Sequence, residues 1–162
     1  MNKKNLLLVI PLLFLLTGCP YYSKIPLSVE PKTPIDTLLL GTWKVNSVNP
    51  DSSEMRIYAF NKMEYYIELV DTDKGGMEIH NCRAFITPVG TTSILNFEEL
   101  KNKGTYMFFR YKINKGKLEL SMVSDEGMKE TYSTSKELWK AFSKRINDST
   151  FYESSERFVR KK

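Results

Sequence analysis

The chain has 162 residues and carries 24 Lys and Arg against 19 Asp and Glu, which gives a formal net charge of +5. Apolar residues make up 41% of the chain and charged residues 27%, a globular composition that excludes a disordered tail. One His and two Cys are too few for most metal clusters or for a disulfide framework. We therefore expect one globular domain with no metal and no cofactor.

The first residues have the pattern of an export signal. Lys3 and Lys4 provide a basic start, and residues 6–16 are apolar, interrupted only by Pro11. A run of this length is too short to span a bilayer, which requires roughly 20 apolar residues. The pattern therefore predicts a removable signal rather than a permanent transmembrane helix.

The signal ends in Leu16-Thr17-Gly18-Cys19, which resembles the bacterial lipobox. The resemblance implies that the chain is cut before Cys19, that its sulfur receives a diacylglyceryl group and that the new amino terminus is acylated. Two or three acyl chains form a stable membrane anchor, whereas one chain binds only marginally. The alternative is an uncleaved anchor with an incidental Cys. We expect a lipid-anchored protein of the bacterial cell envelope whose membrane contact is the lipid on Cys19.

Prolines and apolar patterning divide the chain further. Four prolines lie between residues 20 and 34, in a stretch with no apolar period. Prolines favour extended backbone and cannot donate to a sheet, so this stretch is expected to be a tether that holds the domain off the bilayer. The expected segments are a signal peptide at 1–18, a Pro-rich tether at 19–37 and a barrel domain at 38–162.

Short β-rich runs separated by turn residues fill most of the domain. Breaks with Gly, Asn or Asp recur about every ten residues, which is typical of an antiparallel meander. An open eight-stranded sheet would expose two edges, so we expect a mainly β, single antiparallel eight-stranded barrel. The expected strands are residues 40–48, 54–60, 64–70, 77–87, 92–97, 105–113, 117–123 and 151–160.

One helix is expected before the last strand. Thr134-Ser135-Lys136-Glu137 matches a capping box in which Thr134 is the N-cap residue and Glu137 reaches back to it. Apolar residues then recur at helical spacing on one face. These residues are Leu138, Trp139, Phe142 and Ile146.

Gly41-Thr42-Trp43, at the start of the first strand, resembles the Gly-x-Trp signature of lipocalins and related calycin barrels. In that family the Trp closes one end of the barrel and packs near an Arg from late in the chain, a role open to Arg157 or Arg160. The second lipocalin motif, Thr-Asp-Tyr, is absent, so the resemblance implies a lipocalin-like barrel.

The Pro-rich stretch that leads into residues 39–43, Leu-Leu-Gly-Thr-Trp, also resembles small Bacteroidota lipoproteins. In those proteins acidic residues just after the lipidated Cys favour surface export. Residues 20–24 contain none, so we expect the outer membrane, with the protein facing the periplasm.

A barrel of eight strands can be filled by side chains or can hold one small ligand. We expect a small apolar or amphipathic ligand, with Arg83 or Arg110 orienting an anionic head group. The alternative is a filled barrel that acts as an envelope interaction or assembly module with a protein partner. A cavity of several hundred Å³ would favour the ligand. The expected ligand-binding residues are Trp43, Tyr58, Tyr66, Arg83, Phe109, Arg110 and Tyr111.

No residue pattern indicates catalysis, a metal site or nucleic-acid binding. His80 and Cys82 share a strand face, but no further His or free Cys can complete a zinc site, and proton transfer between positions i and i+2 is awkward. A Gly-x-Ser-x-Gly elbow is absent. Without Lys3 and Lys4 the net charge falls to +3, and an exported protein rarely meets nucleic acid. We expect a protein that is not an enzyme.

Overall fold

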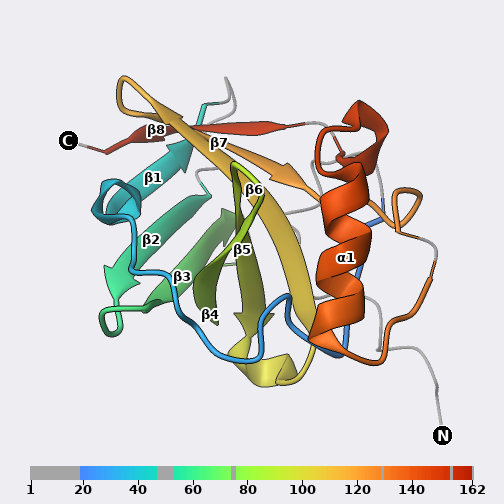
Figure 1. Ribbon diagram of the computed structural model, residues 1–162. Helices are drawn as coiled ribbons and strands as arrows, with labels where there is room; N and C mark the ends of the chain where they lie inside the picture. The colour runs from blue at the N-terminus through green and yellow to red at the C-terminus, as the bar shows by residue number, and fades with distance from the viewer. Residues whose placement is uncertain (1–18, 47–52, 74–75, 129, 154, 162) are drawn as a thin grey trace, which may run out of the picture.

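The computed structural model describes residues 19–46, 53–73, 76–128, 130–153 and 155–161. Its eight strands form one closed antiparallel barrel with a helix before the last strand, which confirms the expected fold (Figure 1). The strands and the helix are β1 (Gly41–Val45), β2 (Glu54–Ala59), β3 (Glu64–Asp73), β4 (Gly76–Val89), β5 (Thr92–Glu99), β6 (Tyr106–Asn114), β7 (Lys117–Met122), α1 (Ser135–Arg145) and β8 (Glu156–Arg160). Three short 3-10 helices are η1 (Thr37–Leu39), η2 (Leu100–Asn102) and η3 (Ser149–Phe151).

Each strand pairs with the next along the chain, and β8 returns to pair with β1. The up-and-down order defines two ends of the barrel. We call the end that holds η1 and the β2–β3, β4–β5 and β6–β7 hairpins the base, and the end that holds η2 and the β3–β4 turn the mouth. Because the barrel is closed, each of the described strands is paired on both sides within the wall.

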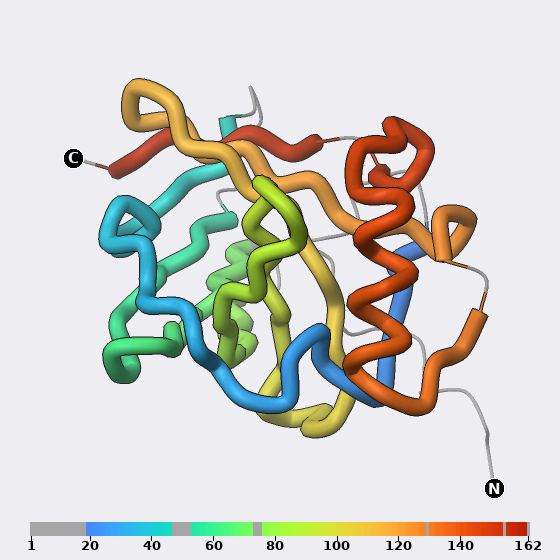
Figure 2. Tube along the Cα trace, viewed as in Figure 1, coloured from blue at the N-terminus to red at the C-terminus, as the bar shows by residue number. Residues whose placement is uncertain are grey.

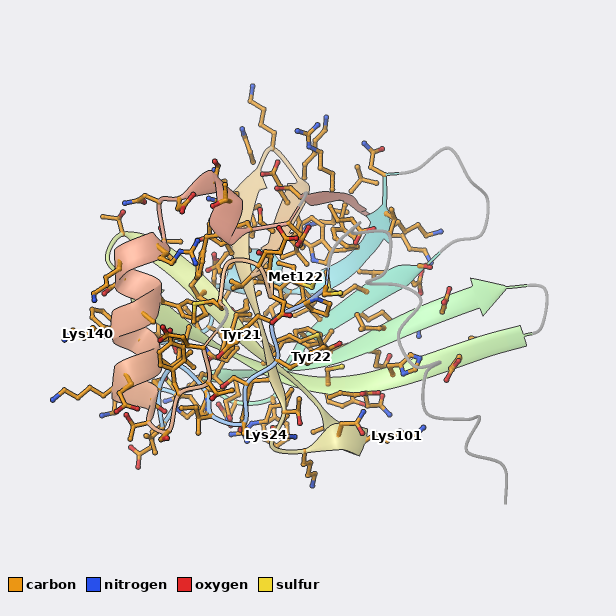
Figure 3. The ribbon with its side chains drawn as sticks, turned by 90° about the vertical axis from the view of Figure 1, so that its right-hand side faces the viewer. Tyr21, Tyr22, Lys24, Lys101, Met122 and Lys140 are labelled. Atoms are coloured by element: carbon orange, nitrogen blue, oxygen red, sulfur yellow. The ribbon has the colours of Figure 1, made fainter. Side chains whose placement is uncertain are left out.

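Beyond the mouth, β3 and β4 continue as a two-stranded ribbon. β2 begins at Glu54, opposite Val70, and β5 ends at Glu99, opposite Cys82. The β3–β4 pairing runs past both positions to Asp73 and Gly76, and Figure 3 shows the ribbon projecting from the body of the molecule. This extension cannot be predicted from the sequence, because turn residues mark where a hairpin bends but not where neighbouring strands stop.

Alternation along the strands sorts apolar side chains into two cores. Inward-facing residues such as Ile67 and Phe109 fill the barrel. Outward-facing Phe108 belongs to a second core between the barrel wall and α1. There the Phe142 ring meets the rings of Phe108 and Phe151 edge-on, with centroids 5.1 and 5.0 Å apart. Edge-to-face pairs of this kind add stability beyond the area they bury.

Helix α1 begins with the capping box that the sequence predicted. Thr134 Oγ1 accepts the Glu137 N–H at 3.2 Å, and Glu137 Oε2 accepts the Thr134 N–H at 3.2 Å. Leu138 and Phe142 are buried against the barrel, while Trp139 lies at the edge of the contact and donates its Nε1–H to the Pro88 carbonyl. Within the described ranges, no helix has both the length and the apolarity to cross a membrane.

Residues 19–35, expected to be a free tether, lie against the outside of the barrel instead. Figure 2 follows this blue segment from the side of α1 to η1 at the base. Near the mouth Tyr21 donates its N–H to the Val123 carbonyl at 3.0 Å, and the Ser23 carbonyl accepts the Tyr106 N–H at 2.8 Å. We call residues 19–35 the strap.

The strap is held by apolar side chains that alternate with its prolines. Tyr21 stacks on Phe108 with a centroid separation of 6.1 Å, and Leu27 is 2% exposed. The Leu27 N–H is donated to Asn96 Oδ1 at 2.7 Å, a bond that satisfies a buried backbone group. Proline fixes an extended backbone but does not prevent docking, which is why composition alone indicated a tether.

Two strap substitutions distinguish a docked strap from a tether. Leu27→Ala should lower the free energy of unfolding by about 2–5 kcal/mol, because it removes a fully buried side chain. Val29→Ala, two residues away, should change it little, because Val29 is 81% exposed. Urea denaturation of both variants measures the difference. Equal stabilities for the two variants would contradict the docked strap.

Candidate functional site

Trp43 and Arg160 close the base of the barrel. Trp43 is fully buried and donates its Nε1–H to the Leu39 carbonyl at 2.8 Å. The Arg160 guanidinium lies 4.5 Å from the centre of the Trp43 ring and donates to the carbonyls of Leu40 and Leu38. This contact joins β8, β1 and η1, and a cation over an indole face is attractive.

Of the two arginines that the sequence left open, Arg160 is the one on Trp43. Arg157 is on the outer surface, with its Nε 3.4 Å from Glu119 Oε2. The backbone at position 41 explains why the Gly-x-Trp motif begins with glycine. Gly41 has a φ of +124°, and a Cβ there would stand 3.1 Å from Arg160 Nη1. A side chain at position 41 would therefore strain the backbone and press on the guanidinium.

Two tyrosines inside the barrel hold the entry to η1. Asp36, the N-cap residue of η1, donates its N–H to Tyr65 Oη at 2.6 Å, and Tyr111 Oη donates to Asp36 Oδ2 at 3.3 Å. Burial raises the pKa of Tyr111 to about 12 and raises that of Tyr65 further, so both hydroxyls stay protonated and able to donate. These bonds hold η1 in place, and we call η1 the plug because it closes the base of the barrel.

The barrel interior is nearly full. Its cavity has a volume of about 20 Å³, which is room for about one water molecule. Pockets that bind drug-sized ligands have roughly 300–1,000 Å³. The cavity is lined by Leu39, Met55, Ile57, Ile67, Leu69, Leu95, Phe97, Phe109, Leu118, Leu120, Glu156 and Phe158.

Glu156 is the one polar residue in this lining. It lies on β8 opposite Leu120, on the same strand face as Phe158. Its Oε1 is buried and has no hydrogen-bond partner within the described residues. Burial raises the pKa of its carboxyl to about 7, because an ionised carboxylate in apolar surroundings loses its hydration.

A second polar group lies inside the mouth. His80 Nδ1 is 3.3 Å from Glu99 Oε1, and Asn102 donates its Nδ2–H to Glu99 Oε2 at 2.5 Å. His80 Nε2 is 3.4 Å from Glu78 Oε1 without hydrogen-bond geometry. Across the described ranges, no three His, Cys, Asp or Glu side chains come together as metal ligands.

Cys82 adjoins this pair but is not poised as a nucleophile. The residue is fully buried and its strand partner on β5 is Glu99. Burial, with a smaller contribution from the Glu99 charge, raises the pKa of the Cys82 thiol to about 12. A thiol must lose its proton to attack, so this side chain is inert at neutral pH.

The expected ligand-binding residues divide between the two faces of the wall. Trp43 and Phe109 belong to the core inside the barrel, and Tyr111 is partly buried against that core. The placement of the other four in a cavity is wrong, because each stands one position out of phase with the inward-facing residues of its strand. These four residues are Tyr58, Tyr66, Arg83 and Arg110.

Both arginines have partners on the outer surface. Arg83 binds Glu64 through its Nε at 2.6 Å and approaches Glu98. The Arg110 guanidinium lies 4.1 Å from the centre of the Tyr152 ring and contacts Ser121. Neither cation is therefore available to a head group inside the barrel.

Glu156 is not among the site residues expected from the sequence, although the pattern of the last strand indicates its position. Residues 156, 158 and 160 share one face of a strand, and apolar Phe158 marks that face as inward. The alternation of inward and outward residues along the last strand therefore predicts that the carboxyl of Glu156 lies in the core.

A hollow with a volume of about 910 Å³ lies outside the barrel, between α1 and residues 126–128 and 130–133. It is open to solvent, and its walls mix Glu130 and Glu137 with Lys140 and Lys144. A binding pocket is usually enclosed and mostly apolar, so this groove lacks the character of a small-molecule site.

Comparison with known proteins identifies no relative: no family model, no curated protein and no solved structure matches this chain. The fold and the site define a closed eight-stranded antiparallel barrel with a plugged base, a filled interior and an externally packed helix.

Glu156 should make stability depend on pH. Its pKa is about 7 when folded and near 4.5 when unfolded, so unfolding releases a proton between these values. Stability should therefore fall as pH rises from about 4.5 to 7. Glu156→Gln should match the wild type at pH 4.5 and exceed it at pH 8 by about 1–3 kcal/mol.

Thermal unfolding of both proteins from pH 4 to 8 measures this difference. Glu156→Leu serves as a second variant, since it removes the carboxyl without adding a polar group. Parallel pH profiles for the wild type and both variants would contradict the burial of this carboxyl.

Proposed function

We propose that the chain is a lipid-anchored protein of the bacterial cell envelope that acts without catalysis, as an interaction or assembly module built on a filled barrel. The observation that carries this proposal is the interior volume of about 20 Å³, which leaves no room for a ligand of ordinary size. The binding surface is then on the outside of the wall.

An exposed aromatic patch supports an external contact. Tyr58 on β2 is 47% exposed, and its ring lies 6.2 Å from that of Tyr66 on β3. Phe60, just after β2, is 67% exposed. Tyr and Phe are enriched where proteins meet partners, and grouped exposed apolar residues mark interaction sites. A protein partner in the envelope fits this patch.

A small apolar or amphipathic ligand inside the barrel is the second candidate. The wholly apolar lining around Glu156 favours it, because one polar group in an apolar pocket orients a bound molecule. The ligand would have to displace core side chains. Its polar end would need a hydrogen-bond donor, since the interior offers a carboxyl rather than an arginine.

Native mass spectrometry of residues 20–162, purified gently from a related bacterium, separates the two candidates. The chain must include the strap, because Tyr21 and Leu27 complete the outer core. We expect the bare protein mass, with no binding of an apolar dye. A reproducible added mass that denaturation releases would instead support the ligand and contradict the filled barrel.

The lipid anchor has its own test, with a matched control in the same chain. The full chain expressed in bacteria should incorporate labelled palmitate. Cys19→Ala should abolish the label, because the acceptor sulfur is lost, whereas Cys82→Ala should retain it. Cys19 is exposed and Cys82 is buried, in keeping with this difference. Labelling that persists in Cys19→Ala would contradict the anchor.

A further inference from the structure

The proposed anchor residue lies against the body of the barrel. The Cys19 carbonyl accepts the Asp125 N–H at 2.9 Å, and Pro20 forms an antiparallel bridge with Ser124. Ser124 and Asp125 follow β7 where that strand ends at the mouth. From Cys19 the chain passes directly into the docked strap, so no free spacer separates the residue from the fold.

We infer that the protein sits with the mouth end of its barrel facing the bilayer, held in that orientation by the lipid on Cys19. The inference rests on the proposed lipid anchor and adds the surface that meets the membrane. A flexible tether over residues 20–35 would span roughly 20–25 Å and leave the orientation free. The hydrogen bonds of the strap remove that freedom.

The chemistry around the anchor suits a membrane interface. Figure 3 shows Tyr22, Lys24 and Lys101 on the side of the molecule that carries the start of the strap. All three are exposed. Tyrosine favours the head-group region, and lysine side chains are attracted to an anionic leaflet.

Acidic residues are also present beside the anchor. Asp125 and Glu126 are exposed next to Cys19, so the surface there is mixed rather than uniformly basic. The lysines therefore favour this orientation only in part. The main determinant is the short attachment of the barrel to the lipid at Cys19.

The antiparallel topology supplies an internal control for this orientation. Lys101 lies in η2, between β5 and β6, at the mouth. Lys62 lies in the β2–β3 hairpin at the base, at the opposite end of the barrel. Both lysines are exposed, so both positions accept a probe.

The test uses the full lipidated chain in vesicles of phosphatidylethanolamine and phosphatidylglycerol. Lys101→Cys and Lys62→Cys each carry a bimane label; Cys82 is buried, and the sulfur of Cys19 holds the lipid. Nitroxide-bearing lipids then quench the fluorescence. We expect several-fold stronger quenching at position 101 than at 62. Inserting a Gly/Ser linker of about 20 residues after Cys19 should abolish the difference.

Each outcome is decisive. Mass spectrometry that finds no acyl group on Cys19 overturns both the anchor and the orientation. An acylated protein with equal quenching at the two positions overturns the orientation alone and leaves the anchor standing. A difference that survives the linker also overturns the inference, because the surface would then bind lipid without the short attachment.

Discussion

The barrel depends on a short seam between its first and last strands. In the part of the chain that the structure describes, three residue pairs join β1 to β8, whereas ten join β3 to β4. The contact of Arg160 with Trp43 reinforces this seam, and its hydrogen bonds to carbonyls near η1 fix the plug to the same strands. If the seam opened, both strands would become free edges and the inner core would meet water.

The closed wall also decides what the interior can accept. Every cation expected to orient a ligand lies outside, where glutamates or aromatic rings already pair with it. The one ionisable group in the cavity lining is the carboxyl of Glu156, whose pKa burial raises to about 7. An anionic head group would therefore meet no counter-charge there. The interior contributes stability, and the contact that we propose with a partner belongs to the outer surface.

The sequence predicted those features that depend on local patterns. Turn residues and alternation located the eight strands, and the capping box located α1, because these signals act over a few neighbouring residues. The inward or outward orientation of each aromatic side chain was harder to predict than the position of the strands. Ile57 and Tyr58 are both suited to a strand, and only the pairing with β3 shows that Ile57 points into the core and Tyr58 away from it.

Long-range contacts account for the other differences. The docking of the strap depends on Asn96 and Val123, which lie far along the chain. The prolines of the strap do not indicate contacts with these residues. The volume of the barrel interior could not be predicted for a similar reason. Whether an eight-stranded barrel is hollow depends on the summed volume of inward side chains, which requires the register of every strand.

The long-range contacts of the strap also bear on the order in which parts of the domain fold. Leu27 is 69 positions from its partner Asn96, and Tyr21 bonds to residue 123, so the first part of the domain to emerge is among the last to dock. Contacts of such long separation form late, because the chain between them must first be ordered. Until β5, β6 and β7 have assembled, the surface of the barrel on which Cys19 docks has not yet formed. In the lipidation that we propose, the modifying enzyme would meet an extended peptide, and folding afterwards would bring Cys19 onto the barrel.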